Sequence, residues 1–253
     1  MNTSASSFKA RIAIAASLVF LGACAATPPD HEGYEAPVYD YQRIVPEDVS
    51  DVAGDVYDPW EGMNRRIYNF NYKFDRYVFL PAVRGYQWIT PDFVEKGVSN
   101  FFNNIRDVRT LVNSILQLKP EKAAQATGRI MVNTTVGLAG LVDVATGMDI
   151  PRPVEDFGQT LGRWGVGPGP YLVVPLLGPS NLRDGIGLLP DAYVQNQIYQ
   201  EAIASPQNDY IFLLDALDTR SQVPFRYYET GISFEYETVR WLISTKRQLD
   251  VEK

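Results

Sequence analysis

The residues that could do chemistry in this 253-residue chain are few, and several common catalytic side chains are missing. After Val56 the sequence contains neither histidine nor cysteine. That part therefore has no imidazole base for a serine nucleophile, no thiolate, and no nitrogen or sulfur ligand for zinc. Four carboxylates lie close together in sequence, and we expect them in a solvated loop: Asp143, Asp149, Glu155 and Asp156. We predict a protein that is not an enzyme, with no metal and no cofactor.

The single cysteine, Cys24, follows the features of a bacterial export signal. Two basic residues precede an apolar run over residues 12–21, which is too short to span a membrane. The sequence Leu-Gly-Ala-Cys then resembles the lipobox of bacterial lipoproteins, in which the cysteine receives a diacylglyceryl group and an N-linked acyl chain such as palmitate. We predict a signal peptide at residues 1–23 and a triacylated Cys24. The alternative is an unmodified thiol in a secreted protein.

We interpret residues 24–56 as a flexible tether. They are rich in acidic residues and proline and have no helical periodicity, which is typical of a chain that buries too little apolar surface to fold. A flexible chain of this length spans about 30 Å. His31, the only histidine, has no second ligand at metal-binding spacing. The net charge of −7 argues against nucleic acid as a partner, because no basic stripe is available to neutralise phosphates.

From residue 57 onward, apolar residues recur at helical spacing in several segments. The first segment opens with a capping sequence at Asp58 and should stop at Pro81. Its apolar stripe comprises Met63, Ile67, Phe70, Phe74 and Tyr77. Further helices are expected from Pro91, Pro120 and Pro224, with shorter ones after Ser180 and Asp209. The pattern fits both a protein core and the acyl region of a bilayer, so both interpretations stay open.

Residues 164–182 carry no charge and are nearly long enough to suggest a membrane span. Four prolines and four glycines deny them a continuous hydrogen-bond ladder, so they cannot span one. Two interpretations remain: a buried loop crossing a soluble core, or a membrane-associated loop beside a cavity. The β-branched runs at residues 138–145 and 171–174 predict an irregular hairpin.

Several uncommon motifs occur in order along the chain and resemble those of the MlaA (VacJ) family. They are Tyr-Asp-Pro-Trp-Glu-Gly-Met-Asn-Arg at residues 57–65, Tyr-Asn-Phe-Asn at 68–71, the Gly/Pro-rich run at 162–171, Pro-Leu-Leu-Gly-Pro-Ser-Asn-Leu-Arg-Asp at 175–184, and Asp-Thr-Arg at 218–220. After Pro224 the likeness is weak. The resemblance implies a helical ring in the inner leaflet of the outer membrane, with an amphipathic channel for phospholipids.

The resemblance also implies a function and partners. Phospholipids misplaced in the outer leaflet would pass to a soluble periplasmic carrier (MlaC-like), which maintains outer-membrane lipid asymmetry, and the protein would associate with a trimeric outer-membrane porin. We therefore predict an all-α fold over residues 57–253, a ring-like assembly of amphipathic helices with an inserted Gly/Pro-rich apolar hairpin. The protein would be lipid-anchored in the outer membrane and embedded from the periplasmic side. The alternatives are a structural or scaffolding lipoprotein without lipid transfer, and a phospholipase, which the missing histidine disfavours.

Three groups of residues are predicted to form the lipid path. Asn69, Phe70 and Asn71 would lie at the boundary between channel and bilayer. A hinge would be formed by Gly165, Gly167, Pro168, Gly169 and Pro170. The hairpin would present apolar side chains to the lipid tails from Tyr171, Leu172, Val173 and Val174, with Leu138 and Leu141 facing them from the other arm.

Overall fold

The structure is a computed structural model that describes residues 56–202, 209–229 and 234–253. The predicted signal peptide, Cys24 and His31 lie outside these residues, as does all of the tether except Val56. Their assignments, and the domain boundary at residue 57, therefore stay predictions.

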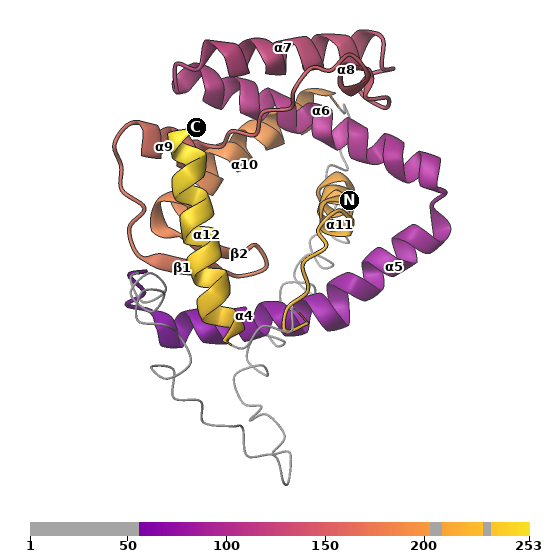
Figure 1. The fold of residues 1–253 in the computed structure, drawn as a ribbon. Coiled ribbons are helices and arrows are strands. Elements are labelled where there is room, and N and C mark those ends of the chain that lie inside the picture. The colour runs from indigo at the N-terminus through magenta and orange to yellow at the C-terminus, as the bar shows by residue number, and fades with distance from the viewer. Residues whose placement is uncertain (1–55, 203–208, 230–233) are drawn as a thin grey trace, which may run out of the picture. The chain divides into compact units, whose positions relative to one another are not determined.

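The described part is built from helices, with one small sheet (Figure 1). In chain order the elements are α4 (Glu61–Phe74), η1 (Asp75–Phe79), α5 (Leu80–Ile89), α6 (Asp92–Leu116), α7 (Pro120–Thr135), α8 (Val144–Gly147), α9 (Phe157–Arg163), β1 (Tyr171–Val174), β2 (Gly178–Asn181), α10 (Leu182–Ala202), α11 (Asp209–Ser221) and α12 (Glu235–Glu252). The predicted all-α class with one inserted hairpin is confirmed.

The first helical segment does not stop at Pro81, contrary to the prediction. A π-helical turn, η1, follows α4, and α5 then begins at Leu80 with the proline at its second position. Proline has no N–H to donate, and the π-helical turn directly before it accommodates this break in the hydrogen-bond ladder without ending the helix. The chain therefore runs in helical conformation from Glu61 to Ile89.

Two other predicted helix starts are wrong. Asp58 does not cap α4; its carboxylate instead accepts hydrogen bonds from Asn64 Nδ2 (2.8 Å) and from the hydroxyl of Tyr236 (2.6 Å). The last helix begins at Glu235, well after Pro224. Asp58 makes tertiary contacts instead of capping the helix, and the residues after Pro224 include a turn before the last helix begins.

All described elements belong to one unit, residues 47–253. Successive contacts close into a circuit that runs from α4 to β1, α10, α6, α11, α5, η1 and back to α4 (Figure 1). Helix α7 packs along α6, and α12 packs on α9 and β2. This circuit is the ring-like arrangement of helices that the sequence predicted.

Burial in this unit is inverted compared with an ordinary soluble domain. Among the described residues, twenty polar or charged side chains are buried, against eleven hydrophobic ones. Helix α4 shows the inversion clearly, since it buries Asn64, Tyr68 and Asn71 and leaves Met63 exposed. The predicted apolar stripe is thus half-buried or exposed and is not the protein core. No helix of the described part has the length and apolar character needed to cross a membrane.

Candidate functional site

The hairpin formed by β1 and β2 is the feature around which the candidate site is built. The strands are antiparallel, and Tyr171 lies opposite Asn181. Alternate residues of β1 point inward, as strand geometry requires, so Tyr171 and Val173 are buried in a cluster with Tyr68. Tyr171 and Val173 therefore cannot face lipid in this conformation, which corrects that part of the prediction.

The other two residues of β1, Leu172 and Val174, are half-buried. They lie on the face opposite the aromatic cluster, and Leu172 reaches toward Gly185 of α10. The candidate lipid-facing side of the strand is therefore reduced to these two residues.

Two asparagines of α4 hold the free edge of β1. Asn64 donates from Nδ2 to the carbonyl of Tyr171 (3.1 Å) and accepts from the N–H of Val173 (2.9 Å). Asn71 donates to the carbonyl of Val174 (3.1 Å) and accepts from the N–H of Leu176 (2.8 Å). The two residues are seven apart and so share one helix face. Each side-chain amide donates to one backbone C=O and accepts from one backbone N–H, so the two asparagines form the hydrogen bonds that a neighbouring strand would form at this edge.

Of the three predicted boundary residues, the structure therefore brings one to the hairpin. Asn71 is buried and acts as a clamp, whereas Asn69 and Phe70 are half-buried on other faces of α4. Phe70 stacks on Phe74 of the same helix, with ring centroids 6.1 Å apart. Asn64, which was named from the sequence only as part of the motif at residues 57–65, is the second half of the clamp.

The tip of the hairpin is apolar and exposed. Leu176 is 54% exposed and Leu177 is 70% exposed, and both lie between the two strands. Leu176 has a positive φ of 66°, which costs a residue with a Cβ about 1 kcal/mol or more. The bond from its N–H to Asn71 holds this conformation.

The segment before β1, residues 165–170, is the predicted hinge. Gly165 and Gly169 have positive φ angles of 92° and 67°, so glycine is needed at both for backbone reasons. No atom would crowd a Cβ added at Gly165 or Gly167. The carbonyls of Pro168 and Pro170 accept hydrogen bonds from the start of α10. The segment is open and is fixed mainly at its end, but its movement stays a prediction.

The predicted pairing of residues 138–145 with β1 is wrong, because β1 pairs with β2. Leu138 and Leu141 instead belong to a turn after α7, and both are exposed. Leu138 has a positive φ of 54°, and the carbonyl of Leu141 accepts a hydrogen bond from Asn100 of α6 (3.1 Å). A strand cannot form through residues with left-handed backbone angles. The turn is bonded to α6 instead of pairing with β1, which was its predicted partner.

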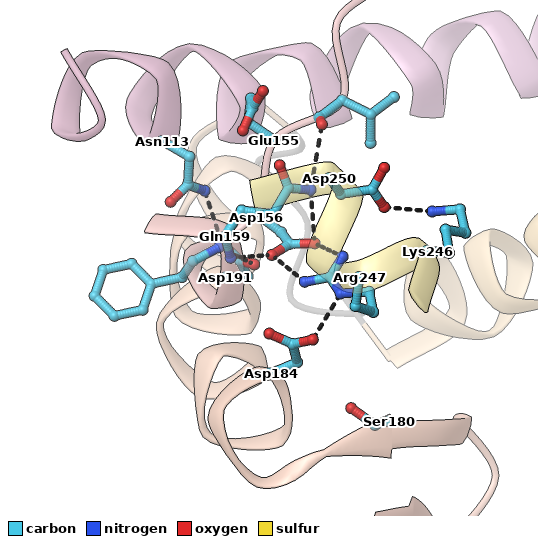
Figure 2. A network of polar contacts seen from close by, with 12 residues as sticks. Asn113, Glu155, Asp156, Gln159, Ser180, Asp184, Asp191, Lys246, Arg247 and Asp250 are labelled. Atoms are coloured by element: carbon cyan, nitrogen blue, oxygen red, sulfur yellow. Dashed lines mark hydrogen bonds and ion pairs between the residues drawn. The ribbon is translucent and has the colours of Figure 1, made fainter. Parts of the chain in front are cut away.

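A charged network supports the other side of the hairpin, and Figure 2 shows it from close by. Arg247 of α12 bonds to Asp156 with both Nη atoms (2.7 and 2.8 Å) and to Asp184 with Nε (2.6 Å). Burial alone raises the pKa of each carboxyl. The hydrogen bonds and charge of Arg247 outweigh burial, so the pKa values of Asp156 and Asp184 lie below the ordinary range.

This network joins segments that are far apart in the sequence. Asp156 caps α9 by accepting from the N–H of Gln159 (2.9 Å), and Asp184 lies in the first turn of α10. The sequence analysis missed all three residues, since it placed Asp156 in a solvated loop and assigned no role to the last helix. An aspartate three residues before Gln159 and next to Phe157 was the one available signal for a helix cap.

The exterior carries many exposed hydrophobic side chains. At the junction between α5 and α6, Trp88 is 88% exposed, and Ile89 and Phe93 are exposed as well. Large apolar patches of this kind mark surfaces that contact protein or membrane. Helix α6 buries four polar side chains together with Phe102 and Ile105, whereas α5 buries only Val83. Both helices leave large apolar side chains exposed.

Comparison with known proteins then places the chain. The family model described as "MlaA lipoprotein" matches residues 56–250. The chain belongs to the MlaA lipoprotein family. The match continues through α12, whereas the sequence motifs carried the MlaA likeness only to about residue 221.

Similar proteins and a solved structure were also found. A protein of Rickettsia prowazekii (strain Madrid E) is 34% identical over 203 residues, which cover 78% of this chain and 79% of the relative. The "Intermembrane phospholipid transport system lipoprotein MlaA" of Escherichia coli (strain K12) is 34% identical over 171 residues, 66% of each chain. A solved structure from work on the "structural basis for maintenance of bacterial outer membrane lipid asymmetry" matches with a TM-score of 0.60 and 27% identity, covering 77% of this chain and 98% of the other.

Proposed function

We propose that this chain is an outer-membrane lipoprotein that provides a channel for phospholipids, removing them from the outer leaflet and passing them to a periplasmic carrier. The observation that carries the proposal is the inverted burial: more polar than apolar side chains are buried between the packed helices, and many large apolar ones are exposed. Membership of the MlaA family supports it, because relatives are named as intermembrane phospholipid transport lipoproteins. Lipid asymmetry of the outer membrane would depend on this passage.

The proposed location follows from the anchor and the apolar exterior. Triacylated Cys24, exposed after removal of residues 1–23, would hold the chain irreversibly in the membrane. The exposed side chains at the α5–α6 junction would place the helices in the inner leaflet from the periplasmic side. A soluble carrier would receive the lipid there, and a trimeric porin would supply the protein surface that flanks the ring.

The proposed lipid path borders the hairpin. Leu172, Val174 and the apolar tip would contact the acyl chains, and Gly165, Gly167, Pro168, Gly169 and Pro170 would let the hairpin move. The Asn64 and Asn71 clamp keeps the strand edge satisfied without adding charge, which favours an apolar strand beside lipid. The proposal includes no catalytic step: the chain would move lipid without hydrolysing it.

A first experiment tests the function in cells. The gene is deleted and then restored with the wild-type chain or with Cys24→Ala, and surface-exposed phosphatidylethanolamine is measured with a membrane-impermeant amine label. We expect deletion to raise surface phospholipid and the wild type to restore it, with Cys24→Ala failing to restore it. Unchanged surface labelling after deletion would overturn the proposal.

A second measurement separates a channel from the scaffolding alternative. The full chain is purified from membranes, and its bound lipid is extracted and identified. It is then placed in vesicles to measure lipid passage to an acceptor. A channel predicts bound phospholipid and passage that depends on the protein. Bound lipid at background level and no passage, with surface phospholipid still raised by deletion, would favour a scaffold.

A further inference from the structure

A cavity of about 200 Å³ lies beside the hairpin, on the side of the charged network. Strand β2 contributes Pro179 and Ser180, and α10 contributes Leu188 and Asp191. Arg109, on α6, also lines this cavity. Figure 2 shows Ser180 and Asp191 near the network. The cavity is therefore next to the proposed lipid path but lined by charged groups.

Most charges around the cavity cancel. Arg247 bonds to Asp156 and Asp184, and Arg183 bonds to Asp184 through its Nε (2.8 Å). Two arginines therefore balance two aspartates. These four side chains carry no net charge together, although the Nη2 of Arg183, which does not line the cavity, has no hydrogen-bond partner among the described residues.

Arg109 and Asp191 are left over. The Nε of Arg109 is buried and has no hydrogen-bond partner, and its guanidinium makes no ion pair with any residue that the structure describes. Asp191 is 6% exposed; its carboxylate accepts from Asn113 Nδ2 (2.9 Å) and from the N–H of Phe157 (3.0 Å). Both donors are neutral. Burial raises the pKa of Asp191, the charge of Arg109 acts in the opposite direction, and no ion-pair contact joins the two side chains among the described residues. A buried carboxylate without a contacting cation is costly unless a ligand compensates it.

The cavity thus presents a cation and an anion that line the same space without an ion-pair contact between them. A lone phosphate would satisfy Arg109 but would bring more negative charge close to the aspartates. A lone ammonium would satisfy Asp191 and leave the guanidinium unpaired. A zwitterion that carries a phosphate and an ammonium satisfies both, because guanidinium groups bind phosphate oxygens and ammonium groups donate to carboxylates.

We propose that this cavity binds the phosphoethanolamine headgroup of a phospholipid, with the phosphate on Arg109 and the ammonium on Asp191. The Ser180 hydroxyl, on β2, would donate to the phosphate, and Leu188 would border the glycerol. This inference rests on the proposed lipid passage and adds a headgroup preference to it.

The ligand side of the proposal is tested on the wild-type full chain in detergent. Soluble dihexanoyl phosphatidylethanolamine is titrated against dihexanoyl phosphatidylglycerol, N-acetylated phosphatidylethanolamine, free phosphoethanolamine and inorganic phosphate. We expect phosphatidylethanolamine to bind about tenfold more tightly than the two lipids without an ammonium. Equal affinity for all three lipids would overturn the headgroup assignment. Inorganic phosphate binding as tightly as phosphatidylethanolamine would overturn it too, since the site would then be a simple anion site.

Two variants test the protein side. Arg109→Gln should weaken the binding of phosphatidylethanolamine and of phosphatidylglycerol to the same extent, about tenfold, because both lipids carry the phosphate. Asp191→Asn should weaken the binding of phosphatidylethanolamine alone. An unchanged affinity of this variant for phosphatidylglycerol would show that the variant is folded. Arg163→Gln and Asp149→Asn change exposed charges outside the cavity and should leave both affinities as they are. Equal losses in Asp191→Asn for both lipids, or none, would contradict the proposal.

Lipid passage in vesicles, measured on the same preparations, separates this inference from the proposed function. Passage that proceeds with no preference for phosphatidylethanolamine and no effect of Arg109→Gln would overturn the headgroup site alone. Selective headgroup binding with no passage in the wild type would support the site and count against the channel.

Discussion

The two sides of the hairpin are held by different chemistry. On the α4 side, Asn64 and Asn71 pair with the backbone of β1 through neutral amides. On the α12 side, Arg247 ties α9 and α10 together through two carboxylates. Amides satisfy a strand edge without placing charge beside apolar residues, whereas the ionic group joins three helices from distant parts of the chain. The difference indicates an apolar, clamped strand next to a rigid charged support.

The largest effect should come from the ionic side. Arg247→Gln leaves Asp156 without its ion-pair partner and leaves Asp184 with Arg183 alone, and we expect the free energy of unfolding to fall by about 3 kcal/mol at neutral pH. Denaturant unfolding of the full chain in detergent measures it. Arg163→Gln, an exposed arginine of α9, is the matched control and should change stability by less than about 0.5 kcal/mol. Equal stability of both variants would mean that the network is only a surface feature.

The amide side should follow. Asn71→Leu keeps the side-chain volume but leaves the carbonyl of Val174 and the N–H of Leu176 without partners, at a cost of about 2 kcal/mol. Asn69→Leu, two residues earlier and away from the strand, is the control. If the two substitutions cost the same, the clamp contributes nothing specific to the hairpin.

The two sides should also differ in their response to acid. Asp156 and Asp184 have lowered pKa values when folded, so their contribution is present above the unfolded value of about 3.9 and is lost as the pH falls through the folded values. The stability gap between wild type and Arg247→Gln should therefore narrow below about pH 4. The gap for Asn71→Leu should stay constant, because amides do not titrate. If the stability differences of the two variants from the wild type change in the same way between pH 7 and pH 3, the two sides of the hairpin are not held by different chemistry.

The smallest effect concerns the tip. Leu176 has a left-handed backbone, which asparagine adopts more easily, so Leu176→Asn should stabilise the chain by about 0.5 kcal/mol. Thermal unfolding measures the gain, and Leu177→Asn serves as a control for the loss of an exposed leucine. A lower midpoint for Leu176→Asn than for the control would show that the leucine side chain outweighs the strain.

Much of the helical fold could be predicted from the sequence. Helices α6, α7 and α11 begin close to the predicted residues, since proline, helical periodicity and polar caps are local signals. The strand Tyr171–Val174 was also predicted. Its partner was not, because a β-branched run indicates a strand without specifying what it pairs with.

The candidate site was predicted only in part. Asn71 was singled out, but its contact with Val174 depends on a fold that brings residues 103 positions apart together. Arg109, Asp191 and Arg247 carry no local signal at all, since charged residues on helices are usually solvated. Their positions beside the hairpin and their contacts become visible only in three dimensions.

The most direct test of the central claim is whether the hairpin must move for lipid to pass. A Cβ built at Gly185 lies 3.4 Å from Leu172 Cδ2, so Leu172→Cys with Gly185→Cys would tie the hairpin to α10. Leu172→Cys alone is the control, because it carries the same change on β1 without a second introduced cysteine on α10. The account predicts that oxidation stops lipid transfer to an acceptor in the first variant, that reduction restores it, and that the control transfers lipid in both states. Complete cross-linking to α10 with unchanged transfer would contradict the account and leave the hairpin as static packing.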